Sequence, residues 1–484
     1  MTQQHETKRG TNRYRIAAAL TPLLVSALAA CTVGPEYQAP ESTLSPLHNA
    51  VTVAARPVGL PAPQLDKWWM GFRDPLLERI VEKALQENLD LKAALARTEQ
   101  ARAAARESGA RLLPSLDATA QGAAQRQSLE SPIGAIGRHL PGYDRDNALY
   151  DVGVSASWEA DLFGGLKRGA EAAGAEAGAA EAAGAGVRIT IVAEAADAYL
   201  QIRGYQLRLR LAGEQVDTDA HLLDLIKQRK AEGTASDREV AQAEALLAQA
   251  RATIPPLRAA REAQMNRLDV VLGDQPGTNA ALLGDNTEIP AVPAIPSSAT
   301  DFLRRRPDVI AAERNLAASS ARIGVATAEY YPKLSLSGLL GFESLDPSRL
   351  FRSTTFQPEA VAGLRWRLFD FGRIDAEVDQ AAAANREALA QYRQSVLHAA
   401  EDVENAFMAL VQKEAETGEL TAEVAALKKA RETSQESYQG GVIALTDVLD
   451  ADRQLLQAQD QLASAGTDAA RAAVGSFRAL GGGW

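Results

Sequence analysis

Cysteine is almost absent from this chain, since Cys31 is the only one among 484 residues. Basic residues and then a short apolar stretch, residues 16–30, precede Cys31, and the stretch ends in small residues. This order is typical of a lipoprotein signal peptide, residues 1–30, whose removal leaves a cysteine acylated with chains such as palmitate. An ordinary signal peptide with an incidental cysteine is the alternative. If Cys31 is acylated, the mature protein has no thiol, which excludes disulfides and cysteine catalysis.

Long apolar runs are also missing. After residue 31 no segment approaches the ~18 apolar residues of a transmembrane helix, so any membrane crossing must be made by β-strands. Aromatic residues make up only 5% of the chain, which argues against an ordinary large globular core. The net charge is −11 and charges of both signs alternate, which argues against nucleic acid as a partner.

The residue types of common catalytic sites form no pattern. The five histidines are scattered, and none has the spacing of metal ligands. Neither a phosphate-binding P-loop nor the G-x-S-x-G sequence of a hydrolase occurs. We therefore predict a protein that is not an enzyme and has no metal or cofactor besides the lipid on Cys31. The energy for any transport must come from a partner.

What the sequence does contain is one long unit present twice. Trp158 and Trp366 lie 208 residues apart, as do Gly233 and Gly441, and related segments surround each pair. We therefore predict a first structural repeat at 67–280, a Pro-rich linker at 281–300 and a second repeat at 301–484. Before the repeats, residues 31–66 hold six prolines and are predicted to form an extended tether.

Within each repeat the hydrophobic period changes from about 3.6 residues to 2 and back. A helix is expected from Pro75 to about Leu113. Four strands of about 10 residues are expected, with a long loop between the first two, at 116–125, 149–158, 334–343 and 356–366. Two proline-free runs, 167–232 and 373–438, are expected as very long helices. They turn at Gly233 and at Gly440-Gly441 and return as second helices.

Four strands cannot close a barrel, and open sheet edges do not survive in lipid. Three chains would supply 12 strands, enough for closure. The predicted fold class is therefore mainly α with a β-barrel part. It is a duplicated unit of four transmembrane strands and long coiled-coil helices, which as a trimer forms a 12-stranded barrel and an α-helical periplasmic tunnel.

Short motifs spread over the mature chain support this architecture. They are Cys31-Thr32-Val33-Gly34-Pro35-Glu36-Tyr37, Trp68-Trp69, Asp74-Pro75, Asn88-Leu89-Asp90-Leu91, Leu113-Pro114, Asp161-Leu162-Phe163-Gly164, Arg304-Arg305-Arg306-Pro307-Asp308, Tyr331-Pro332, Phe369-Asp370-Phe371-Gly372-Arg373 and Asp447-Val448-Leu449-Asp450-Ala451. In this order they resemble the outer membrane factors, the TolC-like channels of tripartite efflux systems, and in particular their lipoprotein branch.

The resemblance implies a homotrimeric channel in the outer membrane of a Gram-negative bacterium, lipid-anchored and extending into the periplasm. Its partners would be a periplasmic adaptor protein and an inner-membrane transporter. It would be a passive exit duct for drugs, small toxic compounds or metal ions. Two alternatives stay open: an outer membrane duct of a protein secretion system, and a lipid-anchored coiled-coil scaffold without a pore. The four predicted strands favour a pore over a scaffold.

The resemblance also places a gate near the helix turns at Gly233 and at Gly440-Gly441. Tyr438 matches the family position that ties inner to outer helices, and its partner position in the first repeat is Glu239. A phenol that donates to this carboxylate would be a charge-assisted latch. The alternative is a turn aromatic that packs on its own helix.

Two carboxylates are candidates for the pore constriction. Asp447 and Asp450 lie three residues apart, so they share a helix face. In a trimer they would place six carboxylates around the constriction, which favours cations. The alternative is that one of them caps the helix and the other is a solvated surface charge. The resembled family has a basic residue where this chain has Ile443, so Arg238 or Arg453 would supply the missing charge.

Two tryptophans close a predicted strand each. Trp158 and Trp366 are candidates for the aromatic girdle at the membrane interface. Packing inside the corner between strand and helix is an equally open alternative.

Overall fold

The computed structural model describes residues 32–40, 46–56, 60–284, 286–296 and 302–484. The predicted signal peptide and Cys31 lie outside the described residues. The described residues form two compact units, one from the ranges 32–40, 100–178 and 313–390, the other from the ranges 46–99, 179–312 and 391–484. None of the described helices is long and apolar enough to cross a bilayer.

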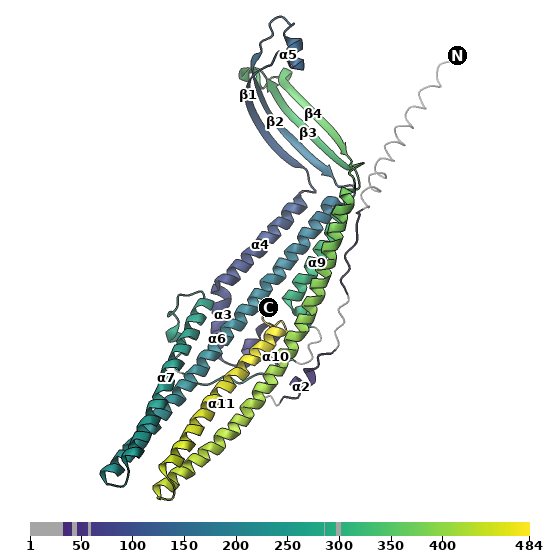
Figure 1. The fold of residues 1–484 in the computed structure, drawn as a ribbon. Helices are drawn as coiled ribbons and strands as arrows, with labels where there is room; N and C mark the ends of the chain where they lie inside the picture. The colour runs from purple at the N-terminus through teal and green to yellow at the C-terminus, as the bar shows by residue number, and fades with distance from the viewer. Residues whose placement is uncertain (1–31, 41–45, 57–59, 285, 297–301) are drawn as a thin grey trace. The chain divides into compact units, whose positions relative to one another are not determined.

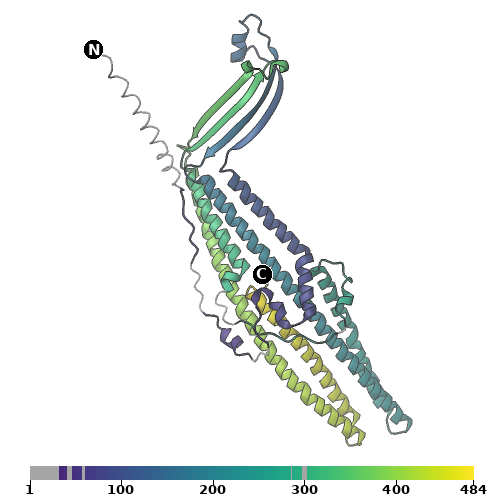
Figure 2. The ribbon, with the colours of Figure 1, turned by 180° about the vertical axis from the view of Figure 1, so that it is seen from behind.

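The first unit contains a four-stranded antiparallel sheet in which the strands follow one another in chain order (Figure 1). The strands are β1 Ser115–Arg126, β2 Asp146–Ala160, β3 Lys333–Ser344 and β4 Phe356–Arg365. All four confirm the segments expected from the alternating pattern, within three residues at each end. Among the described residues, this order leaves one edge of β1 and one edge of β4 without a partner strand, as the view from behind also shows (Figure 2).

The connection between β1 and β2 differs from the expected loop, because it contains the short helix α5 Pro132–Gly137. The Ser131 hydroxyl accepts a hydrogen bond from the Gly134 N–H at 3.1 Å, and Pro132 stands at the first helical position. Both features favour the start of a helix. Between β3 and β4 lie two 3₁₀ turns, η3 Pro347–Arg349 and η4 Ser353–Thr355.

The helix expected from Pro75 to Leu113 is two helices, α3 Pro75–Glu87 and α4 Leu89–Ala110. Asn88 separates them: its side-chain oxygen accepts from the Leu91 N–H at 2.8 Å, which caps α4. The sequence reading missed this cap because the apolar stripe continues across it. In the second repeat the matching helices are α8 Phe302–Arg305 and α9 Pro307–Ala328.

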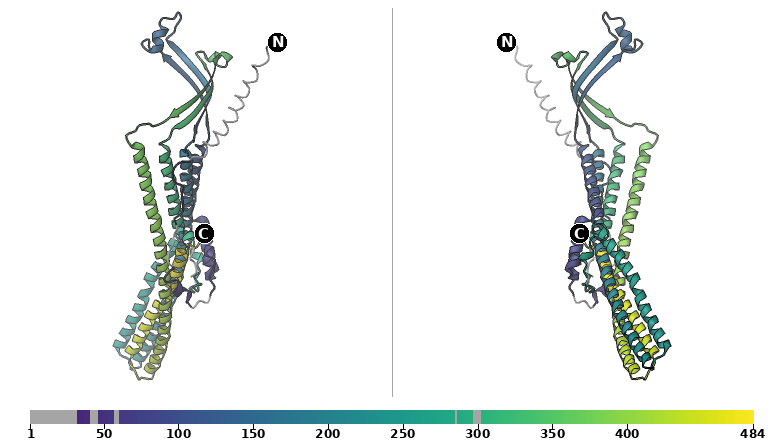
Figure 3. Two further views of the ribbon diagram at one scale, coloured as in Figure 1. Left: turned by 90° about the vertical axis from the view of Figure 1, so that its right-hand side faces the viewer. Right: turned by 90° about the vertical axis from the view of Figure 1, so that its left-hand side faces the viewer.

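The long helices confirm the duplication most directly. The helix α6 Gly165–Ala231 and the helix α10 Arg373–Gln439 are both 67 residues long and begin 208 residues apart. The returning helices, α7 Asp237–Val271 and α11 Leu445–Ala479, are both 35 residues long and share the same offset. In the second unit the two helical hairpins have their turns at the same end (Figure 3).

The N-terminal part of the second unit packs on the end of α11. In the 3₁₀ helix η1 Leu65–Phe72, Trp68 is fully buried and stacks on Phe477 with ring centroids 5.2 Å apart. The expectation of a purely extended tether is wrong at one point, since the helix α2 Ala50–Ala54 forms in the proline-free stretch after Pro46. The linker between the repeats begins with the 3₁₀ turn η2 Ala280–Leu282.

Candidate functional site: the turns of the two helical hairpins

Each long helix ends at a glycine whose backbone is left-handed, a conformation that glycine adopts without steric cost. Gly233 has φ 75° and Gly441 has φ 73°. The N–H of the following residue reaches back to a carbonyl five residues earlier, at 2.8 Å from Thr234 to Arg229 and at 2.9 Å from Val442 to Ser437. This pattern is a Schellman ending, in which glycine has no steric penalty. The turns predicted at Gly233 and Gly441 are thus formed in the same way. Gly440 lies between the end of α10 and the left-handed Gly441.

Acidic residues cap both returning helices. At the start of α7, the Glu239 carboxylate accepts from the Ser236 N–H at 2.7 Å, and the Ser236 hydroxyl accepts from the Glu239 N–H at 3.3 Å. The Ser236 N–H and the Ser236 hydroxyl, which also donates to the carboxylate at 2.9 Å, hold the pKa of Glu239 below its usual value. At the start of α11, the equivalent Asp447 carboxylate accepts from the Ala444 N–H at 3.2 Å. Both helices therefore begin with a carboxylate near their positive end.

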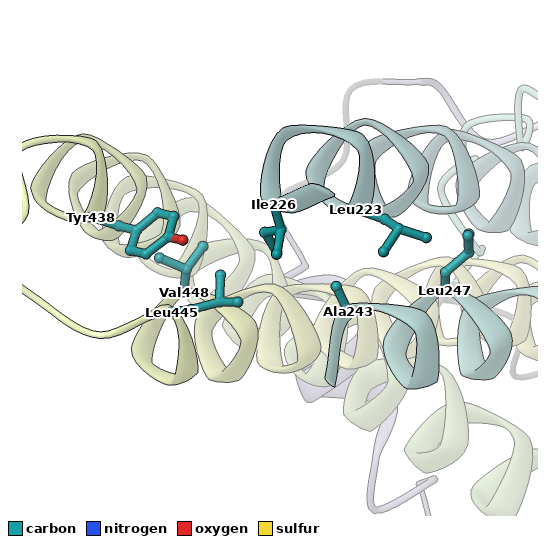
Figure 4. Packing of buried hydrophobic residues seen from close by; sticks show 7 residues of the cluster. All are labelled: Leu223, Ile226, Ala243, Leu247, Tyr438, Leu445 and Val448. Atoms are coloured by element: carbon teal, nitrogen blue, oxygen red, sulfur yellow. The ribbon is translucent and has the colours of Figure 1, made fainter. Parts of the chain in front are cut away.

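Just behind the turns, four helix ends share one small apolar core, which we call the tip cluster (Figure 4). Its members are Leu223 and Ile226 of α6, Ala243 and Leu247 of α7, Tyr438 of α10, and Leu445 and Val448 of α11. Ile443 also packs against it, at the position where the resembled family carries a basic residue. The tip cluster thus joins the hairpin of the first repeat to that of the second.

Tyr438 is the largest side chain in the tip cluster. Its ring is 5% exposed, and the Arg229 guanidinium lies over it at 4.7 Å from the ring centroid. The Tyr438 hydroxyl has no hydrogen-bond partner among the described residues. Burial raises the pKa of the Tyr438 phenol, with the charge of Arg229 opposing and that of Glu239 adding to the shift. The structure therefore brings Tyr438 to Arg229, and Glu239 to Ser236, without the hydrogen bond between Tyr438 and Glu239.

Asp447 and Asp450 are both exposed on one face of α11. Asp450 accepts a hydrogen bond from Arg453 at 3.1 Å, one turn further along the helix. Of the two arginines offered for the missing basic charge, Arg453 is thus paired with Asp450 and Arg238 is exposed on α7. Within one chain, Asp447 caps its helix and Asp450 is paired at the surface. A carboxylate ring between copies stays a prediction.

The two tryptophans occupy equivalent corners of the first unit. The Trp158 indole N–H donates to the Leu112 carbonyl at 3.0 Å, and the Trp366 indole N–H donates to the Tyr330 carbonyl at 2.9 Å. Each bond ties the end of one strand to the chain entering a neighbouring strand. The indoles are still 37% and 50% exposed, so a role at the membrane interface stays a prediction.

Two features of the helical hairpins are not predicted from the sequence. The first is Arg229, which covers the Tyr438 ring. The second is a buried acidic group around Asp219, Arg431 and Asp452. A signal for it exists: Asp219 falls between Val216 and Leu223 at helical spacing, so a carboxylate interrupts an apolar stripe. The described residues contain no cluster of three or more potential metal ligands.

Comparisons with known proteins agree with this geometry. The family described as "Outer membrane efflux protein" matches residues 80–274 and 299–482. The pyoverdine export outer membrane protein OpmQ of Pseudomonas aeruginosa is 32% identical over 426 residues, which are 87% of this chain and 88% of OpmQ. The solved structure of the outer-membrane channel OprN is 33% identical, has a TM-score of 0.84 and covers 94% of this chain and 100% of its own.

The open state of the MtrE outer membrane channel of Neisseria gonorrhoeae is a further structural neighbour. It is 27% identical, with a TM-score of 0.78, and the match covers 94% of this chain and 98% of MtrE. Family, relatives and structures all match over both repeats. This chain therefore belongs to the outer membrane efflux protein family and is an outer membrane channel.

Proposed function

We propose that three copies of this chain form a passive exit duct, which receives small molecules from an inner-membrane transporter through a periplasmic adaptor. The observation that carries the proposal is the four-stranded sheet with two unpaired edges, β1 and β4. An open sheet is not viable in lipid, and about eight strands are the minimum for a closed barrel. Copies of the same chain offer the matching edges.

The lipid anchor belongs to the same proposal. Cys31 would carry the acyl chains, and the chain directly after it is bound to the corner between β2 and α6. The Val33 N–H donates to the Phe163 carbonyl at 3.1 Å, and the Arg168 guanidinium donates to the Val33 carbonyl at 3.2 Å. An acyl group at Cys31 would therefore start close to the end of the strands, where a membrane surface is expected.

The gate would lie at the hairpin turns. The tip cluster holds the two hairpins of one chain together, and the exposed Asp447 and Asp450 would meet their counterparts from the other copies. The related MtrE channel has an open state, so a resting closure that opens is a reasonable model for this chain. For the cargo, OpmQ is named for pyoverdine export, which favours small molecules.

Single-channel conductance of the purified protein in planar bilayers tests the proposal, with wild type compared to Asp447→Ala combined with Asp450→Ala. We expect small, cation-selective currents in the wild type. The double variant should conduct more or lose its cation selectivity, because neutral side chains neither attract cations nor pair with Arg453.

Two results would contradict parts of the proposal. If the double variant forms an inserted trimer whose conductance and cation selectivity both match those of the wild type, the two carboxylates do not line the constriction. A protein that neither inserts nor forms trimers would overturn the duct itself.

A further inference from the structure

A buried acidic group lies in the second unit where three helices meet, nearer the middle of the hairpins than the tip cluster. Asp219 of α6 is 1% exposed and Asp452 of α11 is 2% exposed. Arg431 of α10 donates to the Asp452 carboxylate at 2.7 Å. In the part of the chain that the structure describes, these two buried carboxylates thus share a single guanidinium, and Asp452 accepts its hydrogen bond.

Asp219 is incompletely satisfied in this position. One carboxylate oxygen accepts a hydrogen bond from the Gln215 amide at 2.8 Å, and the other has no partner among the described residues. A buried carboxylate that is ionised and lacks a cation costs several kcal/mol. The protonated form has no such cost, since it is neutral and can donate from its hydroxyl.

Other carboxylates between α6 and α11 are arranged differently. Asp460 accepts two hydrogen bonds from Arg208, at 2.7 and 2.8 Å. Asp197 accepts from Arg471 at 2.6 Å. In each pair the arginine comes from the opposite helix. Asp219 is the position on this contact where a buried acid faces another acid instead.

The electrostatics agree with this geometry. Burial raises the pKa of Asp219 from 3.8 to about 6. The hydrogen bond from Gln215 opposes this rise. The negative charge of Asp452 adds to the rise, and the positive charge of Arg431 opposes it. These groups face Asp219 from α6, α11 and α10. On α7, which also packs against α6, Glu244 is paired with Lys227 at 3.4 Å.

We propose that Asp219 is a gating residue of this channel: its neutral form holds α6 against α10 and α11, and its ionised form loosens this contact. The consequence is a hairpin pair that is tighter in acid. This regulation rests on the proposed function, because loosening of the hairpins matters for conduction only if they enclose the duct.

The direction of this pH dependence follows from the linkage between proton binding and packing. A carboxyl that titrates higher in the packed state than in water favours the packed state at low pH and loses that preference as pH rises through its folded pKa. For values of 3.8 in water and about 6 when packed, the ratio of loosened to packed chains rises about tenfold between pH 5 and pH 7.5.

Two measurements on the full-length trimer test the inference. The first is the open probability in planar bilayers at pH 5 and pH 7.5. The second is amide hydrogen exchange of residues 212–226 and 448–458, corrected for the intrinsic pH dependence, which does not require conduction. Wild type is compared with Asp219→Asn and with Asp217→Asn, a matched control that is exposed on the same helix.

We expect wild type and Asp217→Asn to show about tenfold more opening and faster exchange at pH 7.5 than at pH 5. In Asp219→Asn the open probability and the exchange rate should match the wild-type values at pH 5 at both pH values, because the amide is neutral at both. A pH response that survives in Asp219→Asn, or its absence in wild type, overturns the inference. If exchange responds as expected but no current is seen at either pH, the inference stands and the proposed duct fails.

Discussion

Tyr438 shows how one residue can hold two repeats together without a hydrogen bond. Its ring is part of the tip cluster and lies under the Arg229 guanidinium. Burial of an aromatic ring contributes more than a neutral hydrogen bond, and an arginine over the ring adds about 0.5–1 kcal/mol. The Tyr438 hydroxyl is buried without a hydrogen-bond partner among the described residues, which lowers the stability of the packed state.

Truncation of Tyr438 separates these contributions. Tyr438→Ala should lower the free energy of local opening by about 3 kcal/mol, because a cavity is left among the four helix ends. Tyr438→Phe should change it by less than about 1 kcal/mol, because only the unpaired hydroxyl is lost. Amide hydrogen exchange of residues 432–442 measures both values. A Phe variant as unstable as the Ala variant would instead support a hydroxyl bond to Glu239.

For single residues, the sequence predicts where the helix turns lie better than it predicts which side chains bind each other. Gly233 and Gly441 were found because only glycine suits the turn, which is a local property of the backbone. The bond expected between Tyr438 and Glu239 is not formed in this structure, because Ser236 is three residues from Glu239 and competes locally for the carboxylate. The periodicity does not reveal the buried group of Asp219, Arg431 and Asp452, because it is assembled from helices that are far apart in the sequence.

At the scale of elements, the duplication extends to the hydrogen-bond register of the sheet. The pair Ala120 and Val152 of β1 and β2 maps onto the pair Gly338 and Ala360 of β3 and β4 when the first strand is moved by 218 residues and the second by 208. The four strands were predictable because alternation is a local signal. The helix α5 was not, because a short helix in a Gly-rich loop has no period to detect.

The same two offsets predict how β4 of one copy pairs with β1 of the next. The pair Val152 and Phe342 of β2 and β3 maps onto Ala360 of one copy and Ala124 of its neighbour. In Cys31→Ser chains that carry Ala124→Cys and Ala360→Cys, oxidation should therefore link copies into dimers and trimers, read on non-reducing gels. Gln125→Cys with Ala360→Cys is the control, because neighbouring residues in a strand point to opposite faces. Stronger linkage in the control would refute the register.

At the scale of the whole molecule, anchoring and insertion are separable tasks. The acyl chains would be attached at Cys31, while the four strands would hold the barrel in the bilayer. Two or more acyl chains anchor a protein stably on their own, but a closed barrel needs no lipid to stay inserted. The residues that follow Cys31 are bound to the first unit through Val33, so the anchor would add little to the position of the strands.

Replacement of the single cysteine tests this separation. Cys31→Ser should abolish incorporation of radiolabelled palmitate, because no other cysteine can accept acyl chains. The variant, supplied with an ordinary cleavable signal peptide, should still form trimers in the outer membrane, and its conductance should match that of wild type within about twofold because its strands and tip residues are unchanged. Retained labelling would show acylation at another residue. Loss of the trimer from the membrane would show instead that the lipid, and not strand pairing alone, guides the chains into the barrel.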